Sequence, residues 1–117
     1  MSVELSAEEF ETLVVEELDA LPDDMFDGLD NVVFLTEDRP EDGSLGLLGE
    51  YVGTALTDRD RYGFGELPDR IVLYREPLLA HCADLEQLRD EVHVTLVHEI
   101  GHYYGFDDAK LHELGWA

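Results

Sequence analysis

The first hydrophobic pattern in the chain has the period of a helix. Its apolar members are spaced three and four residues apart, at Phe10, Leu13, Val14, Leu18 and Leu21. Residues with this spacing share one face of an α-helix. Ser6 and Glu9 form the S-x-x-E pattern of a capping box, and Pro22 cannot continue a helix. We therefore predict an N-terminal helix that buries one face.

Three short apolar runs have the composition of strands, at residues 32–35, 47–52 and 71–74. The first is almost wholly apolar, which indicates a strand buried on both faces. The second contains glycine and ends at Gly53, as is typical of an edge strand or of a close approach by another backbone. Pro77 terminates the third and opens a short helical turn at 77–80. One loose turn is expected within 23–30, and the polar segments 37–44 and 58–65 are expected to be surface loops.

The longest predicted helix begins after Asp84, an N-cap with Gln87 three positions on. Its second half, residues 92–100, has apolar side chains distributed around the whole cylinder, which indicates burial on several sides. His98 and His102 would then form a polar stripe inside that buried region, where polar groups need partners. A last short helix is expected at 107–114.

Residues 98–108 read H-E-x-x-H-x-x-G-x-x-D. Histidines four apart lie on one helical face, so His98 and His102 can reach one metal ion. Glu99 projects beside them and has the position of the general base in metallopeptidases. Gly105 permits the left-handed conformation that ends a helix, so the chain can turn back toward the metal. Asp108 is then placed to be the third ligand.

Several residues admit another interpretation. Asp108 could simply cap the last helix, although Asp107 could equally provide that cap. His112 and Glu113 are alternative ligands further along the chain. His93 leaves the helix on the side opposite His98, so a structural role is expected for it.

Charge and cysteine content narrow the function. The 117 residues include 29 acidic and seven basic side chains, a formal net charge of −22. This charge excludes nucleic acid and anionic membranes as expected partners. Cys82 is the single cysteine, so no internal disulfide can form, and we predict one cytoplasmic domain spanning residues 1–117. A high-salt cytoplasm and an arginine-rich, GC-rich genome both remain open as the origin of the acidity.

With these motifs placed, the sequence resembles the small single-domain zincin-like metallopeptidases called mini-zincins. The supporting segments are residues 48–51, 67–71, 75–79 and 112–116. The resemblance implies an α+β zincin-like fold, in which a small mixed sheet of three to four strands packs on the N-terminal helix and a central active-site helix. It also implies one zinc ion per chain, held by His98, His102 and Asp108, with Glu99 as the catalytic glutamate. Both methionines lie upstream of the motif, so Trp116 is our candidate for the floor of the site.

Two functions are compatible with this interpretation. In the first, the protein is a peptidase that hydrolyses peptide bonds by a zinc-activated water with Glu99 as base, and an extended peptide pairs with the strand at 47–52. In the second, it is a zinc-containing binding or regulatory module with weak or lost activity. The intact Glu99 favours the peptidase, and the small size of the domain favours the module. Packing is the expected role of Tyr103 and Tyr104.

Overall fold

The computed structural model describes residues 3–53 and 68–116. Its elements are α1 (Ala7–Asp19), the 3-10 turn η1 (Asp23–Met25), β1 (Val32–Glu37), β2 (Gly49–Val52), β3 (Asp69–Tyr74), α2 (Arg75–His81), α3 (Leu85–Tyr104) and α4 (Asp108–Leu114). The α+β class is confirmed, with a small sheet and a long helix carrying the motif. The predicted loop at 58–65 lies outside the described residues.

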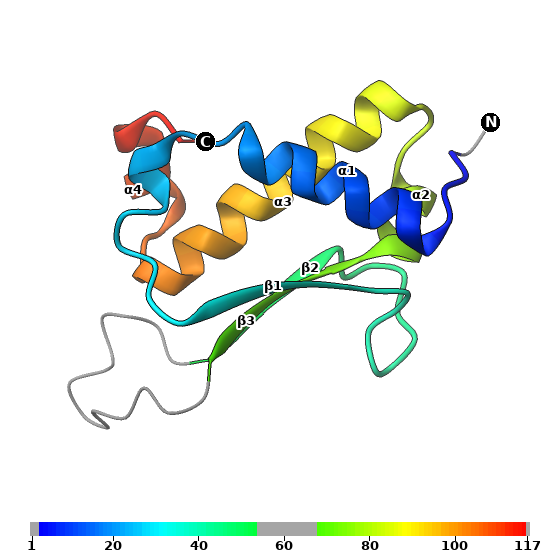
Figure 1. The fold of residues 1–117 in the computed structure, drawn as a ribbon, viewed down its shortest axis with the longest axis horizontal. Helices are drawn as coiled ribbons and strands as arrows, with labels where there is room; N and C mark the ends of the chain where they lie inside the picture. Colours follow the sequence, from blue (N-terminus) through cyan, green and yellow to red (C-terminus); the bar gives the residue numbers. More distant parts are fainter. Residues whose placement is uncertain (1–2, 54–67, 117) are drawn as a thin grey trace.

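The sheet is mixed and has the order β1-β3-β2. β3 is the central strand, parallel to β1 and antiparallel to β2. Helices α1 and α3 lie on one side of this sheet (Figure 1). Ile71 and Leu73 of β3 are fully buried and belong to the same core cluster as Leu96 and Ile100 of α3. The central strand therefore forms the sheet's side of the core beneath α3.

β1 differs from the prediction of a strand buried on both faces. Its residues alternate between half-buried and exposed, and Val33 and Leu35 are 39% and 40% exposed. β1 is an edge strand, and the described helices cover only one face of the sheet, so its outward side chains meet solvent. β2 is confirmed as an edge strand, shorter than predicted.

α1 begins with the predicted capping box. The Ser6 hydroxyl accepts a hydrogen bond from the Glu9 backbone N–H, and the Glu9 carboxylate accepts one from the Ser6 N–H. These hydrogen bonds with Ser6 lower the pKa of Glu9. Near the C-terminal end of α1, Glu16 and Glu17 pair with Arg89 of α3 at 2.9 and 3.1 Å. α1 is thus tied to the first half of α3 and serves as its support.

α2 begins directly after β3, two residues before the predicted start of the helical turn. The strand ends at Tyr74 and α2 starts at Arg75, so the helical turn expected at 77–80 is a seven-residue helix. Pro77 lies in the first turn of α2, where a backbone N–H has no partner within the helix. Proline is therefore compatible with the helix start and does not mark the end of the strand.

Candidate metal centre

α3 has the predicted ends. The Asp84 carboxylate accepts a hydrogen bond from the Gln87 N–H at its start, and Gly105 ends it in the left-handed conformation at φ 79°. The Phe106 N–H donates to the Gly101 carbonyl at 2.9 Å, which closes the last turn. The motif therefore sits on the final two turns of a well-capped helix, immediately before a chain reversal.

The two motif histidines lie together on one side of α3. Their ring centroids are 4.5 Å apart. Their side chains are 47% and 48% exposed, so the prediction that they lie inside a buried region is wrong. Val94, 57% exposed, lies on the same outward side of the helix. The apolar residues of this half of α3 are thus not all buried, and the histidines face the open side.

Glu99 is the buried member of the motif. Its side chain is 8% exposed, and Oε1 lies 2.9 Å from Nδ1 of His102. It faces β2, because a Cβ added to Gly49 would lie 3.7 Å from Glu99 Cγ. The carboxylate therefore stands between the edge strand and the histidines.

His98, Glu99 and His102 form a group that fits a zinc ion. One ligand atom from each lies within 4.8 Å of the others. Imidazole nitrogen and carboxylate oxygen are the ligands that zinc binds at about 2 Å, so neighbouring ligands of a tetrahedral site are about 3.3 Å apart. The chemistry of the donors and their closeness on one helix face match this requirement.

Asp108 lies next to the group and outside it. It is the first residue of α4, and the preceding Asp107 is the N-cap, accepting a hydrogen bond from the Lys110 N–H at 2.8 Å. The alternative role of Asp108 as the cap is therefore wrong. Its Oδ1 lies 3.9 Å from His98 Nδ1, and its side chain is 82% exposed. Asp108 therefore approaches His98 from α4 without being part of the close group.

The alternative ligands lie elsewhere on α4. Glu113 pairs with Lys110 at 3.8 Å, and His112 is in the last turn of the helix. Neither belongs to the group around His98.

Cys82 is buried, and burial, followed by the charges of nearby acidic residues, raises the pKa of its thiol. The Cys82 side chain therefore packs as a small hydrophobic residue.

Trp116 does not have the predicted place beneath the metal. Its ring packs against Tyr104 and Phe106, with centroid distances of 5.9 and 6.1 Å. The Tyr104 side chain leaves α3 about 200° around the helix from His102, so this contact lies away from the histidines. Met25, upstream of the motif, is 1% exposed and belongs to the core cluster.

The tyrosine hydroxyls near the motif are engaged in hydrogen bonds. Those of Tyr103 and Tyr104 bond to the backbone of residues 25–30. Tyr74 donates to the Glu50 carboxylate at 2.9 Å, and burial together with this contact raises the pKa of Tyr74 to about 12. Packing is the role predicted for Tyr103 and Tyr104, and their hydroxyls in addition hold the backbone of residues 25–30.

Two glycines shape the site: Gly49, in the strand for which the sequence predicts an edge position or a close approach, and Gly101, for which it predicts no role. A Cβ at Gly49 would lie 2.6 Å from Thr95 Cγ2, and a Cβ at Gly101 would lie 3.0 Å from Leu111 Cδ2. Gly49 thus lets β2 approach α3 beside Glu99, and Gly101 lets α4 approach α3 in the turn that carries the histidines. A glycine in the middle of a strong helical pattern was the available signal for the second contact.

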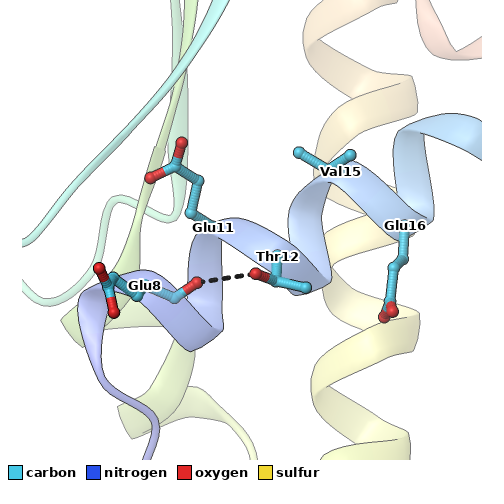
Figure 2. Close-up of a pocket in the computed structure, with 5 residues that line it drawn as sticks. All are labelled: Glu8, Glu11, Thr12, Val15 and Glu16. Atoms are coloured by element: carbon cyan, nitrogen blue, oxygen red, sulfur yellow. Dashed lines mark hydrogen bonds between the residues drawn. The ribbon is translucent and has the colours of Figure 1, made fainter.

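Two surface hollows lie along α1, away from the motif. The larger, of about 440 Å³, is lined by Glu8, Glu11, Thr12, Val15 and Glu16. Figure 2 shows these side chains along one helix, with the Thr12 hydroxyl donating to the Glu8 carbonyl. The second, of about 260 Å³, reaches Leu85 and Arg89 of α3. Neither hollow is lined by a candidate metal ligand.

Comparison with known proteins agrees with this geometry. A sequence model of the zincin-like metallopeptidases matches residues 29–116, and the chain belongs to this family. The chain is also similar to the solved structure of a conserved hypothetical protein from T. thermophilus, with 27% sequence identity and a TM-score of 0.55. That match covers 94% of this chain and 97% of the other. No curated protein matches this chain.

The family implies a bound zinc ion, and His98 and His102 supply imidazole ligands suited to one, with the Glu99 carboxylate beside them. Among the described residues, no helix has both the length and the apolar character needed to cross a membrane.

Proposed function

We propose that the protein is a zinc-dependent peptidase, with one zinc ion per chain bound by His98, His102 and Asp108 and with Glu99 as general base. The observation that carries this proposal is the burial of Glu99 directly beside the exposed histidine pair. A glutamate that only solubilised the helix would point to solvent. A buried carboxylate requires a partner or a task, and here it is directed toward the ligand atoms.

Each residue has a separate task in this mechanism. Zinc, when bound, supplies Lewis acidity that activates a water molecule and polarises a substrate carbonyl. Glu99 accepts the proton from the attacking water and returns it to the leaving amine. The contact between Glu99 and His102 fixes the carboxylate at the edge of the ligand set, and the packing of β2 limits water around it.

The edge strand β2 supports a peptide as the substrate. β2 pairs with β3 on one side only, and within the described residues no strand pairs with its other side. An extended peptide can bond to such an edge as an additional strand. Because Gly49 lies against Glu99, a peptide bound there would pass close to the catalytic carboxylate. The partner we propose is therefore an extended segment of a peptide or protein.

The net charge of the chain bears on its proposed partners and location. At a net charge of −22, nucleic acid and anionic membrane surfaces are repelled. We propose a cytoplasmic protein of one domain, and we keep the high-salt cytoplasm as one origin of its acidity. These features leave the peptide as the partner on which the experiments should concentrate.

A zinc-containing binding module is the second candidate. The histidine side chains are about half exposed, so the candidate ligands lie open to solvent. A site this open would bind a substrate weakly, because deep clefts supply most of the binding surface for small ligands. This observation favours a protein that binds zinc and a partner without rapid turnover.

Metal analysis followed by a peptide assay separates the two functions. The protein is purified without added zinc and its metal content is measured, and a quenched peptide library is then incubated with it, with and without a chelator. Chelator-sensitive cleavage at one zinc per chain supports the peptidase. Stoichiometric zinc without cleavage supports the binding module, and a protein that takes up no zinc contradicts both.

A further inference from the structure

α4 is a short helix that is held against the metal end of α3 at several points. Leu111, 4% exposed, packs against Gly101, where any added Cβ would approach it to 3.0 Å. Gly101 lies directly before His102 in the sequence. The close contact between the two helices therefore occurs within the turn of α3 that carries the ligands.

Three aromatic residues join the two ends of α4 to the end of α3. We call Tyr104, Phe106 and Trp116 the aromatic cluster. Tyr104 and Phe106 are stacked at 5.2 Å with an interplanar angle of 19°, and Trp116 is tilted against both. Phe106 precedes α4 and Trp116 follows it. Both ends of the short helix therefore return to one tyrosine ring on α3.

Tyr104 is itself fixed in place. Its hydroxyl donates to the Met25 carbonyl at 2.7 Å and accepts from the Gly28 N–H at 3.2 Å. A Cβ at Gly28 would lie 2.8 Å from the Tyr104 ring, so the backbone is packed directly on it. The ring against which Trp116 packs is therefore anchored to the backbone at Met25 and Gly28.

The position of Asp108 depends on this packing. Asp108 is the first residue of α4, and its exposed side chain lies 3.9 Å from His98. A short, solvated carboxylate has little packing of its own, so the backbone of α4 must place it. Trp116 packs on the Tyr104 ring, about 200° around α3 from His102, so its route to Asp108 runs through α4.

We propose that Trp116 is a positioning residue for the zinc site: its packing on Tyr104 and Phe106 holds α4 so that Asp108 stands beside His98. This inference rests on the proposed function, because it takes Asp108 as a zinc ligand. Residues that orient metal ligands typically contribute 10- to 100-fold to metal affinity. Removal of the indole should therefore weaken zinc binding although Trp116 does not touch the ion.

The test is a double-mutant cycle on zinc affinity, measured by competition with a chelator dye. Trp116→Ala is expected to weaken zinc binding about tenfold, and Trp116→Phe, which keeps a ring, should recover most of the loss. In the Asp108→Ala background, Trp116→Ala should cause no further loss, because the residue it positions is already absent. Leu114→Ala is the matched control, since Leu114 is on α4 and 40% exposed, and it should bind zinc like the wild type.

Each alternative result has a distinct meaning. Wild-type affinity in Trp116→Ala, with weakened binding in Asp108→Ala, would overturn the positioning role and leave the ligand assignment intact. Equal losses from Trp116→Ala in both backgrounds would show an action on the whole fold and would also overturn it. Wild-type affinity in Asp108→Ala would overturn both the ligand and the positioning role. If Trp116→Ala fails to fold, Trp116→Leu replaces it in the same cycle with the same criteria.

Discussion

Glu99 Oε1 and His102 Nδ1 lie 2.9 Å apart, although the glutamate is buried and the histidine is half exposed. The two residues are three apart on α3, so they are neighbours on the helix surface. Their contact places the candidate base at the border between the packed side of the helix, next to β2, and its open side. A water molecule bound on the open side would be within reach of a carboxylate that solvent does not otherwise surround.

The first prediction separates the base from the ligands. Glu99→Gln keeps the shape of the side chain and removes its ability to accept a proton. We expect wild-type zinc content and peptide hydrolysis lower by roughly 10²- to 10⁴-fold. Metal analysis and cleavage of a quenched peptide are measured on the same preparation. Equal hydrolysis rates for the wild type and this variant would show that Glu99 is not the base.

The second prediction concerns the histidine pair. His102→Ala should abolish stoichiometric zinc, because it removes one of the two imidazoles on the open face of α3. His93→Ala is the matched control: His93 is on the same helix, half-buried, and about 220° around the axis from His98. Zinc content is measured after dialysis of both variants against a weak chelator. Full retention of zinc by His102→Ala would refute the ligand assignment.

The third prediction compares three residues of α4. Asp108→Ala should weaken zinc binding by about tenfold or more, because its carboxylate lies 3.9 Å from His98 Nδ1. Glu113→Ala and His112→Ala should bind zinc like the wild type, since Glu113 pairs with Lys110 and His112 lies in the last turn of α4. Competition with a zinc-sensitive dye gives the three affinities. Loss of zinc in Glu113→Ala, with retention in Asp108→Ala, would make the site a glutamate-type zincin.

The parts of the fold that depend on local chemistry could be predicted from the sequence. Ser6 and Glu9 cap α1, Asp84 caps α3, and Gly105 ends α3 in the left-handed conformation. Each of these features is decided by hydrogen bonds or backbone sterics within a few residues. The spacing of the motif could be predicted for the same reason, because His98 and His102 are brought together by the helix itself.

Burial could not be predicted in the same way. Val33 and Leu35 are exposed because β1 is at the edge of the sheet, and His98 is exposed because the described helices leave one side of α3 open. An apolar run indicates a strand but does not say how many faces other elements cover. The packing of Trp116 on Tyr104 likewise joins parts of the chain through a reversal whose direction local patterns do not determine.

The fourth prediction concerns salt. The chain has 29 acidic and seven basic residues, and several of the basic side chains are already paired, including Arg39, Arg75 and Arg89. Most carboxylates therefore repel one another without a compensating cation, and salt screens this repulsion. The melting temperature should rise from low to molar potassium chloride. A flat or falling curve would contradict repulsion as a dominant cost and would leave the zinc site unaffected.

The last prediction tests the contact between β2 and the motif helix. Gly49→Ala places a methyl group 2.6 Å from Thr95 Cγ2 and 3.1 Å from the Val72 carbonyl. The strand must then move away from α3, which should lower the free energy of unfolding by about 1–3 kcal/mol. Gly46→Ala is the control, because a methyl there would meet only Ser44 Oγ, at 3.5 Å.

Thr95→Ala combined with Gly49→Ala should recover part of the lost stability, because it removes the nearer of the two obstructing atoms. Recovery should be incomplete, since the Val72 carbonyl still lies in the way. Denaturant unfolding is measured for the wild type, the Gly46→Ala control, the two single variants Gly49→Ala and Thr95→Ala, and the double variant. Comparison of the single and double variants gives the coupling free energy between positions 49 and 95. If Gly49→Ala is as stable as Gly46→Ala, β2 does not depend on the absence of a side chain at Gly49. The close approach of the edge strand to Glu99 would then have to be explained by the other contacts of the sheet with α3.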